Sequence, residues 1–469
     1  MGSSQKMGSR IKDSGAASDL ANRGVSGPNL LDSRYLGCDT MVSTGASSKS
    51  GGTIFAKNSD RPAHEAQPLE LHAANPSAAT NTQFVEIDGN VPAYRHIGSR
   101  PDWCWGYEHG FNEHQVVIGN EALPSLLPET DEAKLVGMEI LRLALERGAT
   151  AEEAVNVITG LVEKYGQGKF SNSPGLFTYD NIYLVADPAE AYVIETIGHE
   201  WAVRPVSGVH SISNVSGMDG SARLSDGAEV AAIKYGLFDP SSGTEFSWTD
   251  AYSAVDDAWS GTRRQSRSSS ILAHHDGGID FGKLMLTLSD HGVPEGDPTK
   301  FESAPGDMRG ICTHPKHEGG VTAASLVADL CADGSRLPVY WCGMYAPCMT
   351  LFFPVFIEGE LPEVLSIGGA THSDESPWWM FHALGQEGFE GGADRMKEIH
   401  EGWWDLQKCM FGSAYEMAAR GRAMIDAGER EAASELLTAY MAENTENMLK
   451  VGREMLGARQ GNIKATGAR

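Results

Sequence analysis

The chain has 469 residues, of which 41% are hydrophobic and 21% are charged, a composition typical of globular proteins. It carries 37 Lys and Arg residues against 63 Asp and Glu residues, which gives a formal net charge of −26. This acidity argues against nucleic acids and anionic membranes as partners, because binding to phosphate requires positive charge.

The seven cysteines are odd in number and follow no framework spacing, which favours a reducing, cytoplasmic setting over a disulfide scaffold. We recognise no signal peptide of the usual kind and no apolar run long enough to span a membrane. Residues 1–37 are rich in Ser and Gly and poor in large apolar side chains. We therefore expect this segment to be a disordered leader or propeptide.

The elements expected after the leader belong to an α+β protein. Strand patterns occur at 53–56, 83–87, 115–118, 182–185 and 192–195. The last two are joined by a turn at 187–190, so they should form a hairpin. Two helices are expected between them and the early strands, one over 135–145 and one that starts at the capping residue Thr150 and stops near Gly166. This order predicts layered packing with antiparallel strands rather than a doubly wound parallel sheet.

From about residue 390 the pattern becomes helical, with helices expected over 394–417 and 429–455 and a break near Gly428. We therefore divide the chain into the leader 1–37, a core 38–365 and a mostly helical extension 366–469. The extension could pack on the core or support a homo-oligomer.

Cys38 is the strongest candidate for chemistry. A single Cys is most often a small buried hydrophobe, but Gly37 precedes this one, and the hairpin expected over 39–55 would place it at the start of a strand. If the leader were removed, its thiol could attack an amide while its own α-amine, which titrates near about 7.7–8.0, served as the base. The product would be a thioester that water hydrolyses.

Charged and amide side chains follow at strand ends. Lys57 could lower the pKa of the thiol and Asp60 could hold an amine, although such a pair is more often a surface feature. Asn120 and Asn214 both lie at strand ends, where an amide N–H could stabilise an oxyanion or only complete a turn.

A row of arginines, Arg263, Arg264 and Arg267, precedes the apolar run 271–273. Positive charge at the start of a helix opposes the helix dipole, so these arginines should have carboxylate partners.

Two histidine clusters were considered as metal sites. Cys312 and His314 lie near His317, and a second cluster, His274 and His275, precedes Asp276. Neither spacing fits a standard zinc pattern, so we expect no metal and no cofactor.

Nine segments, taken in order, resemble the secernin family and its cysteine dipeptidase relatives. The resemblance runs from about residue 38 to 360 and weakens in the helical tail. The segments are Cys38-Asp39-Thr40, Lys57-Asn58-Ser59-Asp60-Arg61-Pro62, Ser99-Arg100-Pro101 with Trp103 and Trp105, Gly119-Asn120-Glu121-Ala122, Tyr165-Gly166-Gln167-Gly168, Ala186-Asp187-Pro188, Ile194-Glu195-Thr196, Ser211-Ile212-Ser213-Asn214 and Ser289-Asp290-His291-Gly292.

The resemblance implies a four-layer αββα sandwich of the N-terminal-nucleophile hydrolases, with two antiparallel sheets between helices. It implies a cysteine amidohydrolase, typically a dipeptidase, in a superfamily that includes the bile-salt and penicillin V hydrolases. The catalytic residues that it assigns are Cys38, Asp60, Asn120, Asn214 and Arg267, with Arg264 as the alternative to Arg267. The substrate-binding residues that it assigns are Lys57, Arg61, Trp103 and Trp105.

Lys57 takes a position that Arg holds in the bile-salt enzymes. The chain also departs from many relatives because 37 residues precede its Cys. The leader must be removed before the α-amine exists.

Three readings of the function stay open at this stage. The first is a hydrolase of small peptides or other acyl amides, with dipeptides as the first candidates. The second is a non-catalytic interaction protein on the same scaffold, because a fold does not fix a function. The third is a metallohydrolase that uses the histidines.

Overall fold

The computed structural model describes residues 37–78, 82–89, 91–170, 178–255, 260–292, 310–314 and 320–466, with side chains up to 457. The leader prediction for residues 1–36 lies outside this part of the chain. No helix in these ranges is both long enough and apolar enough to cross a bilayer.

The first large sheet is antiparallel throughout and contains Cys38 on one of its inner strands. Its six strands, in spatial order, are β12 (Val209–Ile212), β1 (Cys38–Ser43), β2 (Ile54–Pro62), β14 (Gly320–Asp329), β15 (Val339–Met344) and β16 (Phe353–Val355).

The second large sheet is also antiparallel, and one of its central strands, Asp180–Ala186, is buried along its whole length. Its eight strands, in spatial order, are β13 (Arg223–Leu224), β11 (Glu200–Val206), β10 (Ala191–Ile197), β9 (Asp180–Ala186), β8 (Val117–Leu123), β7 (His109–Asn112), β6 (His96–Ser99) and β3 (Leu69–His72). A separate ribbon pairs β4 (Asn75–Ala78) with β5 (Val91–Ala93).

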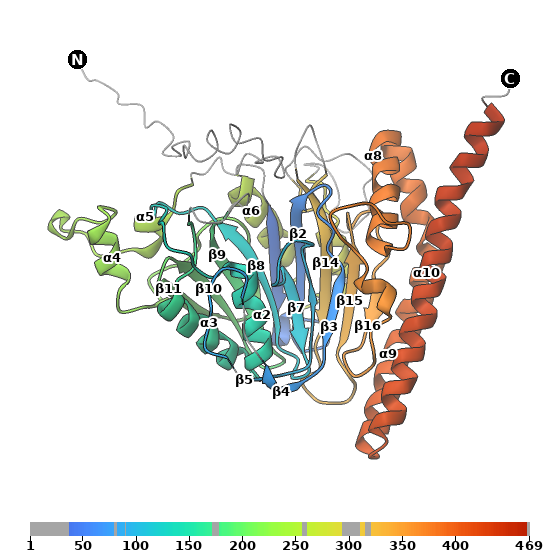
Figure 1. Cartoon of the computed structure of the whole chain (residues 1–469), viewed down its shortest axis with the longest axis horizontal. Helices are drawn as coiled ribbons and strands as arrows, with labels where there is room; N and C mark the ends of the chain where they lie inside the picture. The colour runs from blue at the N-terminus through green and yellow to red at the C-terminus, as the bar shows by residue number, and fades with distance from the viewer. Residues whose placement is uncertain are drawn as a thin grey trace.

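Helices cover the outer faces of both sheets. On the first sheet, α6 (Ser260–His274) lies on β1 and β12, and α7 (Phe281–Leu288) lies on β2 and β14. On the second sheet, α2 (Gly137–Arg147) and α3 (Ala151–Tyr165) lie on β7 to β11. Because β1 also contacts β8 and β9 of the other sheet, the layers are α, β, β and α (Figure 1). This arrangement confirms the predicted fold class.

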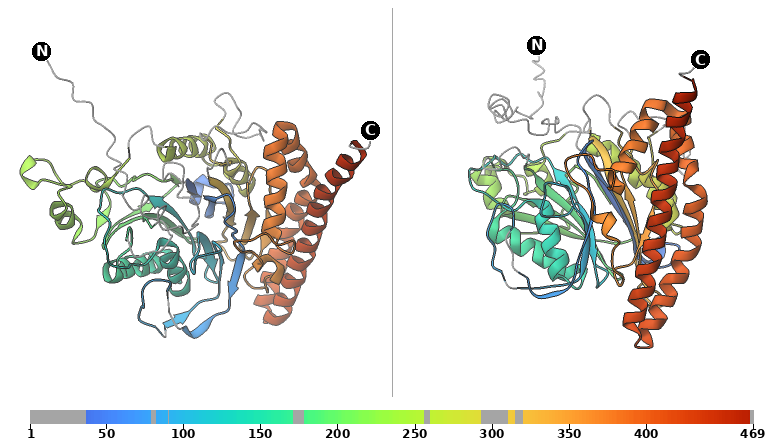
Figure 2. Two further views of the ribbon diagram at one scale, coloured as in Figure 1. Left: turned by 45° about the horizontal axis from the view of Figure 1, so that its top comes forward. Right: turned by 45° about the vertical axis from the view of Figure 1, so that its right-hand side comes forward.

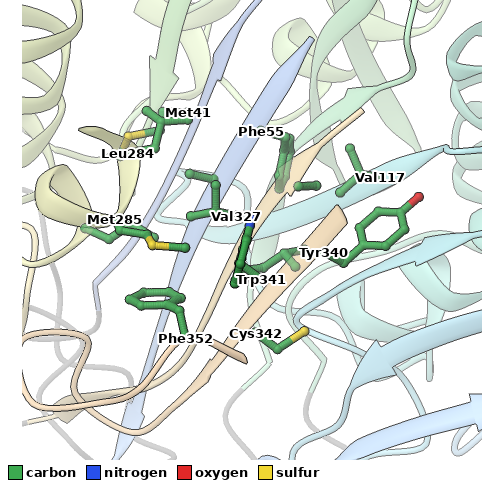
Figure 3. Close-up of a cluster of buried hydrophobic side chains, with 14 of the residues drawn as sticks. Met41, Phe55, Val117, Leu284, Met285, Val327, Tyr340, Trp341, Cys342 and Phe352 are labelled. Atoms are coloured by element: carbon green, nitrogen blue, oxygen red, sulfur yellow. The ribbon is translucent and has the colours of Figure 1, made fainter. Parts of the chain in front are cut away.

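Buried hydrophobic side chains fill the spaces between these layers, and Figure 3 shows some of them on both faces of the first sheet. Between the first sheet and its helices, Met41 packs with Leu284 of α7. Between the two sheets, the ring of Phe111 stacks on the ring of Tyr340. Burial of such side chains is the main favourable term that holds sheet to sheet and sheet to helix.

The predicted helical segment at the C-terminus is present. It consists of α8 (Pro377–Gly402), α9 (Trp404–Asp426) and α10 (Arg430–Thr466), which lie side by side along the β15–β16 edge of the first sheet (Figures 1 and 2). Gly428 separates α9 from α10 with a φ of 84°, a backbone conformation that favours glycine. The use of this segment in a homo-oligomer stays a prediction.

Tryptophans attach this segment to the core. Trp378 donates from Nε1 to the Ala323 carbonyl at 2.9 Å, and Trp403 donates to the Met349 carbonyl at 3.0 Å. Trp404, by contrast, is 51% exposed.

Smaller helices join these elements. They are α4 (Ala228–Lys234), α5 (Trp248–Tyr252) and the 3₁₀ turns Gly45–Ser47, Pro240–Ser242 and Glu363–Ser366.

Most predicted elements of the core are found, with one clear exception. The hairpin is β9–β10, and Thr150 caps α3 by accepting from the Glu153 amide at 3.1 Å. The predicted strand at 83–87 is wrong, since this segment is irregular. Its amide at Gln83 bonds the Glu139 carboxylate of α2 instead of a neighbouring strand. The apolar side chains of this segment pack on the helix layer, and an apolar run alone does not distinguish this packing from that of a strand.

Candidate active site

The pairing of β1 with β2 sets the geometry around Cys38. Cys38 lies opposite Ser59, and Thr40 lies opposite Lys57. Directly opposed residues point to the same face of a sheet, so Cys38, Thr40 and Lys57 share one face. This face meets the second sheet at Gly119, where an added Cβ would lie 2.5 Å from Lys57 Cδ.

The Cys38 thiol is buried between the two sheets, with 6% of the residue exposed. The Asp60 amide donates to Cys38 Sγ at 3.3 Å. Burial raises the pKa of the thiol well above its ordinary value, and the charge of Lys57 opposes this shift only in part. At neutral pH the thiol is therefore protonated, and a base is needed to generate the thiolate.

The backbone nitrogen of Cys38 is bound by Asn214. It donates to Asn214 Oδ1 at 2.8 Å, and Asn214 Nδ2 donates in turn to the Ala122 carbonyl on β8 at 2.8 Å. The neighbouring Ser213 hydroxyl donates to the Cys38 carbonyl at 3.2 Å. The segment after β12 therefore fixes both backbone polar groups of Cys38.

Arg264 of α6 is the arginine beside this nitrogen. Its Nη2 donates to the same Asn214 Oδ1 at 2.6 Å, and its Nε donates to Asp39 Oδ2 at 2.9 Å. Both residues of the Arg264–Asp39 ion pair are almost fully buried. A side chain held by so many bonds cannot easily shift.

Arg267, which the resemblance assigned to catalysis, lies one helical turn further along α6. Its Nε and Nη2 contact the two carboxylate oxygens of Asp290 at 3.1 and 2.6 Å. The predicted carboxylate partners of the arginines are thus Asp39 for Arg264 and Asp290 for Arg267. The structure brings Arg264, and not Arg267, to Asn214 and Cys38.

Asp60 lies on β2, and its backbone amide is the group that binds the Cys38 thiol. Its side-chain carboxylate has partners of its own. It accepts hydrogen bonds from the hydroxyls of Thr313 and Thr322, each at 2.6 Å. Burial raises the pKa of Asp60 to about 7, although Arg264 acts in the opposite direction. Asp60 is therefore close to its titration point at neutral pH.

A buried Lys57 links the thiol to β8. Its Nζ donates to the Asn120 carbonyl and lies 3.5 Å from Glu121 Oε1, which also accepts from Thr40. Burial lowers the pKa of Lys57, but Cys38, Glu121 and other nearby groups raise it above its ordinary value overall. Burial raises the pKa of Glu121 to about 7.

The side-chain amide of Asn120 is held within the second sheet. It lies 2.9 Å from Asn181 Oδ1 on one side and 2.9 Å from the Glu108 carbonyl on the other. Among the described residues, no hydrogen bond joins this amide to Cys38. Its role as an oxyanion donor stays a prediction.

The predicted substrate-binding residues fall into two places. Arg61 is bound by Glu65 at 2.6 Å and by the Tyr179 hydroxyl at 3.0 Å, with its guanidinium 5.7 Å from the Trp103 ring. Trp105 instead packs against Arg142 of α2, with 4.0 Å between ring and guanidinium. Arg61 and Trp103 therefore lie together, while Trp105 lies at the helix layer.

Several residues of the site were not found from the sequence. Asp39 binds Arg264, Glu108 binds Arg61, and Glu121 binds Lys57. Ser213 binds the Cys38 carbonyl, and Thr313 and Thr322 bind Asp60. Asp39, Glu121 and Ser213 lie beside predicted site residues in the sequence, and that adjacency was the available signal. Glu108, Thr313 and Thr322 gave none, because only the packing of distant strands brings them close.

No protein family model matches the chain. Among solved structures, the chain is similar to a Cys-to-Ala mutant of conjugated bile acid hydrolase from Clostridium perfringens, with 13% identity and a TM-score of 0.38 over 66% of this chain and 89% of that one. An Arg-to-Leu variant of the same hydrolase gives 12% identity and a TM-score of 0.38 over 65% and 89%.

A Caenorhabditis elegans ortholog of N-acylethanolamine-hydrolyzing acid amidase gives 13% identity and a TM-score of 0.24, over 44% of this chain and 88% of that one. At these values the likenesses carry no argument about activity. The αββα arrangement described above rests on the strands and helices of this chain.

Proposed function

We propose that the chain is an N-terminal-nucleophile cysteine amidohydrolase, in which Cys38 becomes the first residue once the chain up to Gly37 is removed. The observation that carries this proposal is the hydrogen bond of 2.8 Å from the Cys38 nitrogen to Asn214 Oδ1 at the start of β1. An amine freed at this atom already has its acceptor. It belongs to the same residue as a thiol that needs a base.

The proposed reaction uses one amine twice. The Cys38 α-amine takes the proton of the thiol, and the thiolate attacks the carbonyl carbon of the substrate amide. When the C–N bond breaks, the ammonium returns its proton to the leaving amine, and a thioester remains on Sγ. Water then attacks the thioester with the amine again as base, which releases the acid and restores the thiol.

The surrounding residues have positioning roles in this proposal. Asn214 orients the amine, and Arg264 holds Asn214 through the shared Oδ1 atom. Lys57 favours the thiolate, because its charge lowers the pKa of Cys38. Asp60, with a pKa of about 7, supplies a carboxylate beside the reacting residue.

Small peptides, and dipeptides first, are the proposed substrates. Among the described residues, three carboxyl groups, those of Glu65, Glu108 and Glu121, pair here with two cations, Lys57 and Arg61. An excess of carboxylates favours a substrate with a positive group, such as the free amine of a dipeptide. Acyl amides of other kinds are the alternative substrates.

The first experiment determines where the mature chain begins. Mass spectrometry of the purified protein should find a chain that starts at Cys38. Cys38→Ser and Cys38→Ala should abolish hydrolysis of a dipeptide panel, while Cys104→Ser, a change at another buried thiol, should retain it. An intact chain that starts at Met1 and is fully active would overturn the proposal.

A second candidate is a non-catalytic interaction protein on the same scaffold. The low exposure of Cys38 favours it, because a substrate must reach a residue that is only 6% exposed. A chain that begins at Cys38 but hydrolyses neither dipeptides nor acyl amides would support this candidate.

A further inference from the structure

Four side chains from separate segments meet at one buried point near Asp60. His291 follows α7, Cys312 and His314 belong to the segment 310–314, and Cys348 follows β15. One nitrogen or sulfur atom from each residue lies within 4.8 Å of the corresponding atoms of the other three. All four residues are buried, and none is more than 5% exposed.

The two distances from His314 to the cysteine sulfurs are close to those of a tetrahedral metal site. His314 Nε2 lies 3.4 Å from Cys312 Sγ and 3.2 Å from Cys348 Sγ. With metal–sulfur bonds of about 2.3 Å and metal–nitrogen bonds of about 2.0–2.1 Å, tetrahedral angles place nitrogen and sulfur ligands about 3.6 Å apart. The observed distances are close to this value.

Hydrogen bonds alone do not account well for the same contacts. An imidazole nitrogen has either one proton or one lone pair, so His314 Nε2 cannot make two full hydrogen bonds. Its other nitrogen, Nδ1, is buried and has no hydrogen-bond partner among the described residues. A cation that shares its charge among the ligands would satisfy Nε2 and both sulfurs.

Charge balance points to a divalent ion of the softer kind. Two thiolates and two neutral imidazoles around Zn²⁺ give a net charge of zero, which suits a buried site. Hard cations such as Mg²⁺ and Ca²⁺ prefer oxygen ligands and would be poorly served here. Four protein ligands also leave no open position, which is typical of structural rather than catalytic zinc.

Backbone contacts hold the ligand segments close to one another. An added Cβ on Gly310 would lie 2.4 Å from the Asp290 carbonyl and 2.5 Å from His291 Cα, so only glycine allows this approach. The Cys312 amide then donates to the Asp290 carbonyl at 2.9 Å. On the other side, His400 of α8 contacts the Cys348 carbonyl at 3.1 Å.

We propose that His291, Cys312, His314 and Cys348 bind one Zn²⁺ ion as a structural site, which goes beyond the proposed hydrolase activity. This departs from the sequence-based expectation of no metal. That expectation considered Cys312 and His314 with His317, which lies outside the described residues. In the second candidate cluster, His274 is the exposed last residue of α6, and His275 follows the helix and is partly buried.

The zinc site would also stabilise the surroundings of Asp60. Thr313 lies between two of the ligands in sequence, and its hydroxyl donates to Asp60 Oδ2 at 2.6 Å. An ion that fixes Cys312 and His314 therefore fixes the donor to this carboxylate. The ion itself takes no part in the proposed reaction.

Metal analysis of the full chain, purified without chelators and dialysed after exposure to Zn²⁺, tests the proposal. We expect roughly one zinc ion per chain. Cys348→Ser should lose the zinc, while Cys342→Ser should keep it, because Cys342 is a buried thiol of β15 outside the cluster. Replacement of zinc by Co²⁺ should give the visible absorption of tetrahedral cobalt and a thiolate-to-cobalt charge-transfer band.

The wild-type chain alone decides the outcome, whether or not the variants fold. Absence of both zinc and the cobalt spectrum in folded wild-type protein would overturn the proposal, and so would a Cys312–Cys348 disulfide found in place of the metal. Neither measurement depends on turnover. A failure of the zinc proposal is therefore distinguishable from a failure of the proposed hydrolase function.

Discussion

The guanidinium of Arg264 lies against the backbone of Gly37, where a Cβ added to Gly37 would be 2.6 Å from Arg264 Cζ. The same guanidinium binds Asp39 and Asn214, so it cannot move aside without breaking buried hydrogen bonds. The residue before the proposed nucleophile is thereby restricted to glycine. Through this contact, the position of Arg264 affects the peptide bond that must be cut to remove the leader.

Gly37→Ala should therefore slow removal of the leader by roughly 10- to 100-fold, since overpacking of this kind costs about 1–3 kcal/mol. The ratio of full-length to mature chain, followed by mass spectrometry, measures the effect. Mature protein obtained from this variant lacks residue 37 and should show wild-type turnover. Gly160→Ala, where the new Cβ meets nothing within 4 Å, is the matched control, and equal processing of both variants would contradict the prediction.

Arg264→Lys should reduce turnover by roughly 100-fold, because a lysine cannot bind Asp39 and Asn214 together and the lost bonds to charged groups are worth about 1.5–3 kcal/mol each. Arg267→Lys, which disturbs the pair with Asp290 instead, should have a much smaller effect on turnover. Steady-state kinetics on mature protein compare the two variants. The opposite ranking would return the catalytic assignment to Arg267.

The two arginines also show how far the sequence could predict the site. Arg264 and Arg267 are one helical turn apart and project from similar sides of α6, so both could reach β1 in principle. Only the packing of α6 on β1 and β12 decides which one meets Asn214. Cys38 and Lys57 were predictable as neighbours, because their strands are consecutive in the chain and consecutive strands commonly pair.

Residues brought together by distant segments could not be predicted in this way. His291 and Cys348 join Cys312 and His314 only because α7 packs on β14, which pairs with β15 in the first sheet. The strand predicted at 83–87 failed for a similar reason, since an apolar run shows that a segment is buried and not what covers it.

Stability should depend on pH through Asp60, whose pKa is raised by burial from 3.8 to about 7. Between about pH 4 and 7 the native state then binds more protons at this group than the unfolded state, so its contribution to stability falls as the pH rises. The slope is at most about 1.4 kcal/mol per pH unit for one group. Asp60→Asn should flatten the fall in the free energy of unfolding over this range, as measured by urea denaturation.

Asp333→Asn is the control for this titration. Hydrogen bonds from Ser335 lower the pKa of Asp333 to about 2, below the range of interest. The pH dependence of this variant between about pH 4 and 7 should match that of the wild type. An Asp60→Asn variant with an unchanged slope would show that Asp60 does not titrate there.

Lys57 and Glu121 form a fully buried ion pair at 3.5 Å. Removing the charge of one partner should lower the free energy of unfolding far more than removing both charges. Lys57→Met should lower the free energy of unfolding by about 3–5 kcal/mol, because the carboxylate remains buried without its cation. In the double variant Lys57→Met, Glu121→Gln, no charge remains at this pair. The decrease in its free energy of unfolding should therefore be smaller than the sum of the decreases in the two single variants. Urea denaturation of the four proteins of this cycle gives the coupling directly. Strict additivity would mean that Lys57 is balanced mainly by other groups, for which the carboxyl groups of Glu108 and Asp60 are the candidates.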